Sequence, residues 1–178
     1  YKKLESLANL KDSKILVIGA GKTNTALIRK MKKHGASDFT IFNRTLSKAE
    51  KLAENCGGKA YDLNTLGTKK IDFNVLITCT GSEHHILDHA MYENIKPKTN
   101  ESTVIVDLAI PNDVSEKVRT SYPVQYISVD GLRELAAKNM DKRRAHLSHC
   151  EEIIAAQVHT FRELDKIRQV EIAMRTVP

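Results

Sequence analysis

The chain has 178 residues, of which 41% are hydrophobic and 28% are charged. This length and composition suit one soluble globular domain with its own core, with or without appendages. No apolar run approaches the roughly 18 residues that a membrane-spanning helix needs, and no charged-then-apolar leader opens the chain. We therefore expect no membrane partner. Because the chain begins at Tyr1 rather than at Met, we expect a piece of a longer protein.

The formal net charge of +6 has two interpretations, a lysine-rich solvated surface or a face that attracts an anionic partner such as RNA. Scattered basic residues with few aromatic residues among them favour the first. The three cysteines, Cys56, Cys79 and Cys150, form no CxxC pair. A disulfide framework or a structural zinc site is therefore not expected, and the reducing cytoplasm fits this cysteine usage.

Apolar runs alternate with helical patterns along the first 130 residues, which is typical of βαβ units. A short apolar strand at 15–18 ends at Gly19. A helix is expected at 23–34, with Gly35 at its end, followed by a strand at 39–42 and a helix at 46–56 that stops at a Gly-Gly pair. Further strands are expected near Ala60 and at 75–79, 104–108 and 125–128. Fully apolar strands indicate a parallel sheet with helices on both faces.

The predicted fold class is therefore α/β, a doubly wound Rossmann-like parallel sheet with a long C-terminal helix. Its ligand crevice is expected at the carboxyl ends of the strands. The expected organisation is the end of a preceding linker or helix at 1–10, the Rossmann-like domain at 11–130 and a long linker helix at 131–178.

The C-terminal third carries a helical stripe without proline. Apolar residues recur every three or four positions, at Leu147, Cys150, Ile154, Val158, Phe161, Leu164, Ile167, Val170 and Met174. Forty helical residues extend roughly 60 Å, whereas a domain of about 130 residues has a radius of gyration near 14 Å. This favours one projecting helix whose far end is buried by something outside the chain. The alternative is two helices with a break near Asn139, folded back on the sheet.

The segment from Gly19 to Asn24 lies between the first strand and the first helix. There the first glycine permits a tight turn, and Gly21 lets the backbone approach a pyrophosphate. Thr23 belongs to the same helix start, while Lys22 is either a further cation near the phosphates or a solvated lysine. Asn24 occupies the usual third glycine position, where it is expected to push the helix out slightly.

The second strand is followed by Asn43, Arg44 and Thr45, without the acid that an NAD-preferring fold carries for its ribose hydroxyl. Arg44 suits a 2′-phosphate, and Thr45 can cap the next helix and also donate to that phosphate. Lys48 adds a cation one turn on. The residues together predict NADPH as the cofactor. Thr80, Gly81 and Ser82 follow the fourth strand, and their loop is expected on the ribose and phosphate side.

No complete acid–base or nucleophilic constellation is visible, so no catalytic residue and no metal ligand is predicted. Cys79 is interpreted as a buried core residue rather than as a nucleophile. His84, His85 and His89 cluster without a clear additional ligand, although the last two have helical i,i+4 spacing. Asp107 ends a buried strand and is expected to cap or orient the neighbouring loop.

These motifs, taken in order, resemble the NADPH-binding domain of the glutamyl-tRNA reductase family, with part of its spinal helix. The matching segments are 16–21, 42–53, 76–82, 106–114, 128–132 and 138–154. The resemblance implies an NADPH-dependent oxidoreductase of tetrapyrrole (haem and chlorophyll) biosynthesis. In that family a cysteine in an N-terminal domain attacks glutamyl-tRNA, and the thioester is reduced to glutamate-1-semialdehyde.

The family's cysteine motif is not found here, so the resemblance implies a cofactor domain that is inactive by itself. It also implies glutamyl-tRNA as substrate of the longer enzyme, a homodimer formed through a C-terminal domain outside this chain, and Ala109 at the cofactor. The sequence departs from the family at Asn24, Asn112 and Gly131, where the family usually has Gly, Arg and Asp. The first two departures are either variations of the lineage or changes that weaken cofactor binding.

Two alternatives remain open at this point. One is a shikimate-dehydrogenase-like NADP reductase, which shares the glycine turn and an Asn-Arg-Thr segment. That family normally carries a second glycine pair in the turn and Asn-Ala-Thr-Pro after the fourth strand, where this chain has Thr78-Cys79-Thr80-Gly81. The other is a non-catalytic NADP-binding regulatory module in which the long helix transmits a signal.

Overall fold

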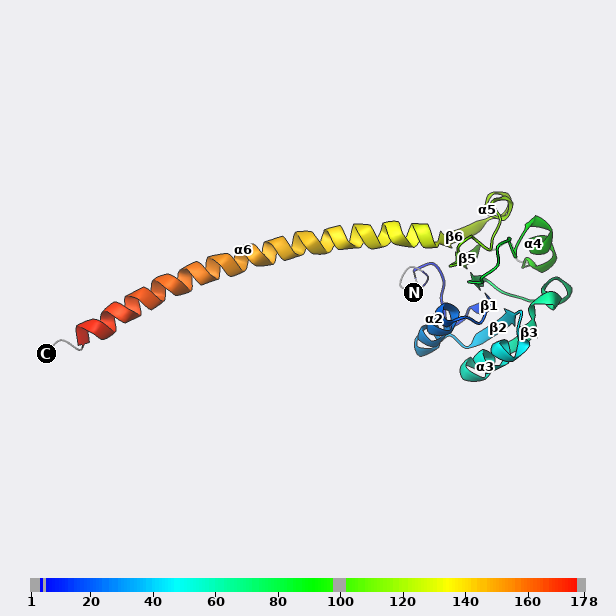
Figure 1. Cartoon of the computed structure of the whole chain (residues 1–178), viewed down its shortest axis with the longest axis horizontal. Helices are drawn as coiled ribbons and strands as arrows, with labels where there is room; N and C mark the ends of the chain where they lie inside the picture. The colour runs from blue at the N-terminus through cyan, green and yellow to red at the C-terminus, as the bar shows by residue number, and fades with distance from the viewer. Residues whose placement is uncertain (1–3, 5, 98–101, 176–178) are drawn as a thin grey trace. The chain divides into compact units, whose positions relative to one another are not determined.

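The computed structural model describes residues 4, 6–97 and 102–175. The chain divides into two compact units, Tyr1–Leu132 and Arg133–Pro178. The first unit contains the sheet and its helices, and the described part of the second unit is helical (Figure 1). The site described below lies within the first unit.

Six strands form one sheet in which every neighbouring pair is parallel. Their order across the sheet is β3-β2-β1-β4-β5-β6. The order reverses between β1 and β4, and a crevice at the carboxyl ends of these two strands is the usual ligand position in such sheets. The predicted doubly wound fold is confirmed, with strands β1 (Lys14–Ile18), β2 (Asp38–Asn43), β3 (Lys59–Asp62), β4 (Val75–Thr78), β5 (Thr103–Asp107) and β6 (Val124–Ser128).

Apolar side chains cover both faces of the sheet, which explains why its strands read as continuous apolar runs. In β1, Ile15 and Val17 belong to one core cluster, while Leu16 and Ile18 belong to the other. The helices that contribute to these two layers are α2 (Lys22–Lys33), α3 (Leu46–Cys56), the short 3₁₀ helix η1 (Leu63–Thr68), α4 (His89–Ile95) and α5 (Glu116–Ser121).

The predicted helix ends agree closely with the structure where glycine sets them. The helix α3 ends at Gly57, whose φ of +76° lies in the left-handed region that favours glycine. The helix α2 runs from Lys22 to Lys33, one residue earlier at each end than predicted, and Gly35 follows its cap residue His34 with φ +96°. No sequence signal had indicated η1, α4 or α5 as separate elements.

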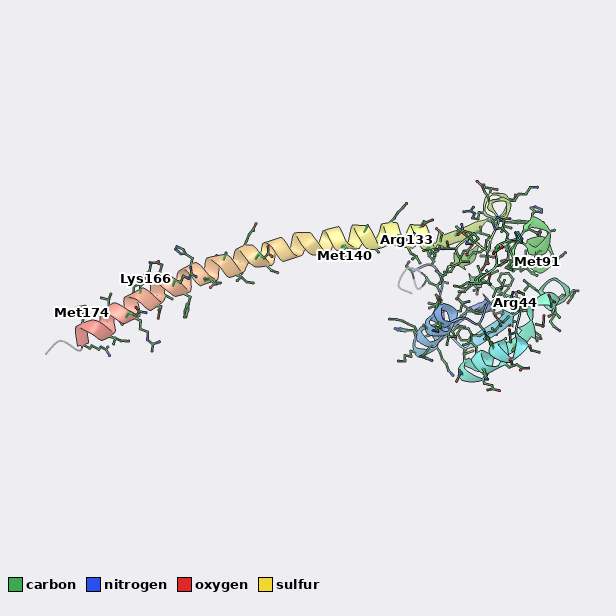
Figure 2. All side chains as sticks on the ribbon, viewed as in Figure 1. Arg44, Met91, Arg133, Met140, Lys166 and Met174 are labelled. Atoms are coloured by element: carbon green, nitrogen blue, oxygen red, sulfur yellow. The ribbon has the colours of Figure 1, made fainter. Side chains whose placement is uncertain are left out.

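The helix α6 (Val129–Arg175) is continuous across Asn139, so the alternative of a break there is wrong. Its described apolar side chains from Met140 onward are exposed, with Val158 at 43% and Phe161 at 69%. Met140, Lys166 and Met174 mark its length in Figure 2. The side chain of Leu147 lies outside the described residues, and projection of α6 from the sheet domain stays a prediction. No helix in the described part of the chain is both long and apolar enough to cross a membrane.

Candidate functional site

The two glycines of the turn after β1, Gly19 and Gly21, differ in what a side chain at their position would meet. Gly19 has φ +97°, and a Cβ built there would lie 2.4 Å from the Cys79 carbonyl oxygen. Its amide donates to the Phe42 carbonyl oxygen at 2.7 Å, so the turn crosses close to both neighbouring strands. A Cβ built on Gly21 would meet no protein atom within 4 Å. Gly19 is therefore needed by the fold, whereas Gly21 leaves open space above the backbone.

The start of α2 presents unused backbone donors to that space. Gly21 is the N-cap residue and provides no side-chain cap, and the first turn contains no acidic residue. The first N–H groups of a helix have no partner within the helix, and the helix dipole favours an anion there. This end of α2 is therefore suited to a phosphate group.

Asn24 is buried inside the turn. Its Nδ2 donates to the Ile18 and Gly19 carbonyl oxygens at 3.0 and 2.7 Å, which ties the first turn of α2 to the end of β1. Its Oδ1 has no hydrogen-bond partner in the described structure. Asn24 thus braces the backbone of the turn, and with Lys22 and Thr23 it lies outside the residues that line the cavity described next.

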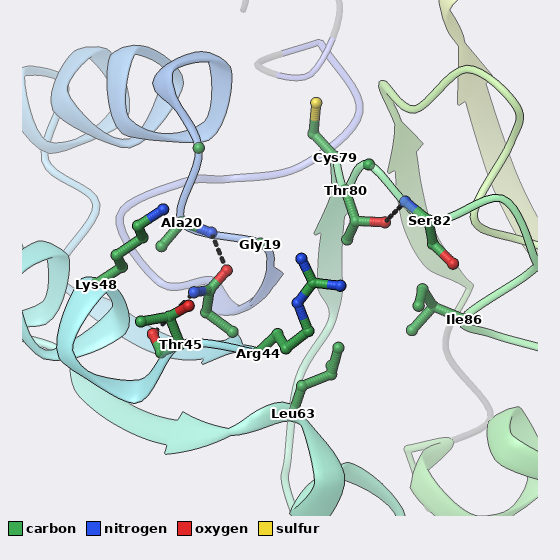
Figure 3. Close-up of a pocket in the computed structure, with 13 residues that line it drawn as sticks. Gly19, Ala20, Arg44, Thr45, Lys48, Leu63, Cys79, Thr80, Ser82 and Ile86 are labelled. Carbon is green, nitrogen blue, oxygen red and sulfur yellow. Dashed lines mark hydrogen bonds between the residues drawn. The ribbon is translucent and has the colours of Figure 1, made fainter.

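A cavity of about 390 Å³ lies at the carboxyl ends of β1, β2 and β4 (Figure 3). Its size is in the range of small-molecule sites. Arg44 extends into it between the glycine turn and the loop after β4. The described lining contains two cations and no acidic residue, and consists of Gly19, Ala20, Gly21, Asn43, Arg44, Thr45, Lys48, Leu63, Cys79, Thr80, Gly81, Ser82 and Ile86.

Asn43 connects the glycine turn to the basic segment that follows β2. Its Oδ1 accepts from the Ala20 amide at 3.0 Å, and its Nδ2 donates to the Thr45 carbonyl oxygen at 2.8 Å. Thr45 is the N-cap residue of α3 as predicted, but its hydroxyl forms no cap hydrogen bond. Among the described residues, neither Arg44 nor Lys48 forms an ion pair. The hydroxyl and both cations are therefore available to a ligand.

The opposite wall of the cavity is the loop after β4. Asp113 is buried and accepts from the Thr78 hydroxyl, the Thr80 amide and the Thr80 hydroxyl. Asp107 accepts from the Ala109 and Val114 amides at 3.1 and 3.0 Å, which confirms its expected role in orienting the loop after β5. Ala109 is buried against that carboxylate and does not line the cavity.

Sequence reasoning overlooked Asp113 and the lining residues Leu63 and Ile86. Leu63 begins η1 and Ile86 lies in the loop after β4, and the strand order brings these two segments close together. A signal for Asp113 was present in the sequence. It is an acidic residue six positions after Asp107, in a loop expected at the crevice end of the sheet.

Cys79 is half-buried and lines the cavity, so it is not the fully buried core residue that was predicted. Its thiol donates to the Leu108 carbonyl oxygen at 3.4 Å. Burial raises the pKa of the Cys79 thiol above its ordinary value, although a hydrogen bond with Thr23 partly opposes this. Since the thiolate is the nucleophilic form, the environment disfavours reactivity.

The histidines after β4 face separate partners. His85 Nδ1 lies 2.7 Å from the Asn112 carbonyl oxygen, and His89 Nε2 lies 3.2 Å from the Tyr122 hydroxyl. Within the described residues, no group of three or more His, Cys, Asp or Glu side chains is arranged to hold a metal ion.

The parallel sheet, the glycine turn at its switch point and the adjacent basic loop define a Rossmann-like domain of the kind that holds a nicotinamide dinucleotide. Residues 2–135 match the sequence profile of the Shikimate / quinate 5-dehydrogenase family, and the chain belongs to this family of oxidoreductases.

Individual relatives are glutamyl-tRNA reductases. The chain is 35% identical over 164 residues to the glutamyl-tRNA reductase of Methanothermobacter marburgensis and 31% identical over 165 residues to that of Methanocaldococcus jannaschii. Each match covers 92% of this chain and 41% of the relative. The chain thus spans about two fifths of the length of these relatives, and the resemblance recognised in the sequence is confirmed.

Solved structures agree with this relationship. The glutamyl-tRNA reductase of Methanopyrus kandleri superposes with a TM-score of 0.69 at 28% identity, covering 89% of this chain and 40% of that one. Shikimate dehydrogenase from Aquifex aeolicus gives a TM-score of 0.52 at 25% identity, covering 75% and 48%.

Proposed function

We propose that this chain is the NADPH-binding domain of a glutamyl-tRNA reductase. The observation that carries the proposal is the cavity at the switch point. There Arg44 and Lys48 form no ion pair among the described residues and stand beside the Thr45 hydroxyl, which makes no cap hydrogen bond, and the described lining contains no acidic residue. A ribose hydroxyl is usually held by an acid at this position, whereas a phosphate needs cations and donors. The identities of the relatives support the reductase assignment.

The residues divide into three groups by the part of NADPH that they would hold. Gly19, Gly21, Lys22 and Thr23 would hold the pyrophosphate through the start of α2, while Asn24 and Asn43 brace that turn. Arg44, Thr45 and Lys48 would hold the 2′-phosphate. Thr80 and Gly81 would form the wall on the other side, whereas the buried Ala109 does not line the cavity and is not proposed as a contact. When bound, NADPH supplies a hydride.

We assign no catalytic residue to this chain, and we expect the 178-residue chain alone to bind NADPH and to turn over no substrate. Glutamyl-tRNA would be the substrate of the longer enzyme, with glutamate-1-semialdehyde as product and the cytoplasm as its location. The exposed apolar residues of α6, such as Phe161 and Leu164, support an interaction with a further part of the enzyme, and we propose a homodimer formed through residues outside this chain.

The longer protein that contains this chain tests the proposal directly. It should oxidise NADPH when glutamyl-tRNA is supplied and release the semialdehyde. In that protein we expect Arg44→Glu to raise the KM for NADPH at least 30-fold, because a carboxylate would repel the 2′-phosphate. The exposed Arg168 on α6 offers a control, since Arg168→Glu makes the same charge change outside the cavity. An unchanged KM for NADPH in Arg44→Glu would contradict the cofactor assignment.

The family profile favours one second candidate, an NADP-dependent shikimate or quinate dehydrogenase. The same longer protein distinguishes the two candidates. Shikimate-dependent reduction of NADP⁺ without glutamyl-tRNA activity would support the dehydrogenase. Glutamyl-tRNA-dependent oxidation of NADPH without shikimate activity would support the reductase.

A further inference from the structure

The loops that follow β4 and β5 are joined to each other by main-chain hydrogen bonds. The Leu87 amide donates to the Asp113 carbonyl oxygen at 2.9 Å, and the Ser115 amide donates to the Leu87 carbonyl oxygen at 3.0 Å. Leu87 and Val114 form a parallel bridge here, outside the main sheet. The backbone of Asp113 is therefore fixed at the base of the loop that lines the cavity.

The side chain of Asp113 reaches further into that loop. One oxygen accepts from the Thr78 hydroxyl at 2.5 Å and from the Thr80 amide at 3.0 Å, and the other accepts from the Thr80 hydroxyl at 2.6 Å. The Thr80 hydroxyl oxygen also accepts from the Ser82 amide at 3.2 Å. One buried carboxylate thus determines the path of Thr80, Gly81 and Ser82, which form one wall of the cavity.

We propose that Asp113 is a positioning residue, which holds the wall formed by Thr80, Gly81 and Ser82 in its binding shape and so sets affinity for the dinucleotide without reading its 2′-phosphate. This inference rests on the proposed function. Asp113 does not line the cavity, and the cations that distinguish NADPH from NADH stand on the opposite wall. Loss of the Asp113 side chain should therefore lower the affinities for NADPH and NADH by the same factor, whereas loss of the Arg44 side chain should lower the affinity for NADPH alone.

Substitutions at Asp113 and Thr78 separate positioning from charge. Asp113→Ala removes all three acceptor contacts, and we expect the affinities for NADPH and NADH to fall by the same factor, about tenfold. Asp113→Asn should restore binding, because its amide oxygen accepts from Thr78 and from the Thr80 amide while its nitrogen donates to the Thr80 hydroxyl oxygen. Thr78→Val removes one donor at a buried position that does not line the cavity, so any loss of affinity must act through Asp113.

The control for loss of a carboxylate is Asp38→Ala, at an exposed position at the first residue of β2. Hydrogen exchange of residues 79–88 without cofactor gives a second measurement, and Asp113→Ala should speed exchange at the Thr80 and Ser82 amides. Unchanged exchange, or a loss confined to NADPH, would overturn the positioning role. Failure of the proposed function would appear separately, as a wild-type chain with an ordered loop that binds neither NADPH nor NADH.

Discussion

The two walls of the cavity use their polar groups in opposite ways. On the β2 side, Arg44, Lys48 and the Thr45 hydroxyl form no ion pair or cap hydrogen bond among the described residues. On the β4 side, Asp113 and Thr80 are fully engaged with each other. The two walls therefore have separate roles. The β2 wall offers free polar groups that can recognise a ligand, whereas the β4 wall uses its polar groups to hold the shape of a loop.

The glycine turn combines both behaviours and gives the largest expected effect. Gly19→Ala places a Cβ against the Cys79 carbonyl at a positive φ, and we expect it to lower the free energy of unfolding by about 3 kcal/mol or more. Gly21→Ala meets no protein atom, so its cost should stay below about 1 kcal/mol. Denaturant unfolding of the two variants measures the difference. Equal losses of stability in the two variants would contradict the account in which Gly19 is needed by the fold and Gly21 leaves room for a ligand.

Asn24 should behave like the shape-holding wall. Asn24→Ala removes a buried donor from the Gly19 carbonyl oxygen and from the Ile18 carbonyl oxygen, which still accepts from the Cys79 amide, and we expect a cost of about 2 kcal/mol of stability. The same unfolding measurement applies, with Thr25→Ala as a neighbouring control on the more exposed face of α2. A stability unchanged by Asn24→Ala would mean that the turn does not depend on this brace.

Thr45 should behave like the recognition wall. Thr45→Val removes a hydroxyl that makes no cap hydrogen bond, so the fold should be nearly unaffected. Affinity for NADPH should fall about tenfold, or about 1.4 kcal/mol, while affinity for NADH is unchanged. Titration calorimetry with both cofactors is the measurement. A loss of stability without a change in NADPH affinity would make Thr45 a structural residue only.

The smallest expected effect concerns the pH dependence of stability. Burial raises the pKa of Asp113, and the charge of Asp107 adds to the increase while hydrogen bonds from Thr78 and Thr80 oppose it. The folded state thus binds this proton more tightly than the unfolded state, so the contribution of Asp113 falls as pH rises from about 3.9 through the raised pKa. Relative to Asp113→Asn, the wild type should gain stability as pH falls from 7 towards 4 in denaturant titrations. A wild type that loses stability relative to Asp113→Asn as pH falls would show that folding lowers the pKa of Asp113 instead of raising it.

Local signals in the sequence predicted most of the fold. The strands were visible because both faces of the sheet are buried, and the end of α3 was visible because Gly57 takes a left-handed conformation. The short helices α4 and α5 have too few turns for a clear apolar period. The start of α2 was misplaced by one residue because Lys22 carries no cap signal.

The candidate site was predictable on one wall only. Arg44, Thr45 and the turn glycines follow strand ends within short, recognisable segments. Asp113 meets Thr80 across 33 residues of chain, a contact that depends on the adjacency of β4 and β5. The slight displacement of α2 expected from Asn24 stays a prediction, but the bonds of its amide to the end of β1 were not foreseen, because a glycine at this position has no side chain to form them.

Titration of the 178-residue chain with NADPH and NADH, in the wild type and in Arg44→Glu, tests the central claim most directly. We expect the wild type to bind NADPH at least tenfold more tightly than NADH, a difference of about 1.4 kcal/mol, and Arg44→Glu to abolish that preference. Equal wild-type affinities for the two cofactors, or a preference for NADPH that survives Arg44→Glu, would contradict recognition of a 2′-phosphate by the wall on the β2 side.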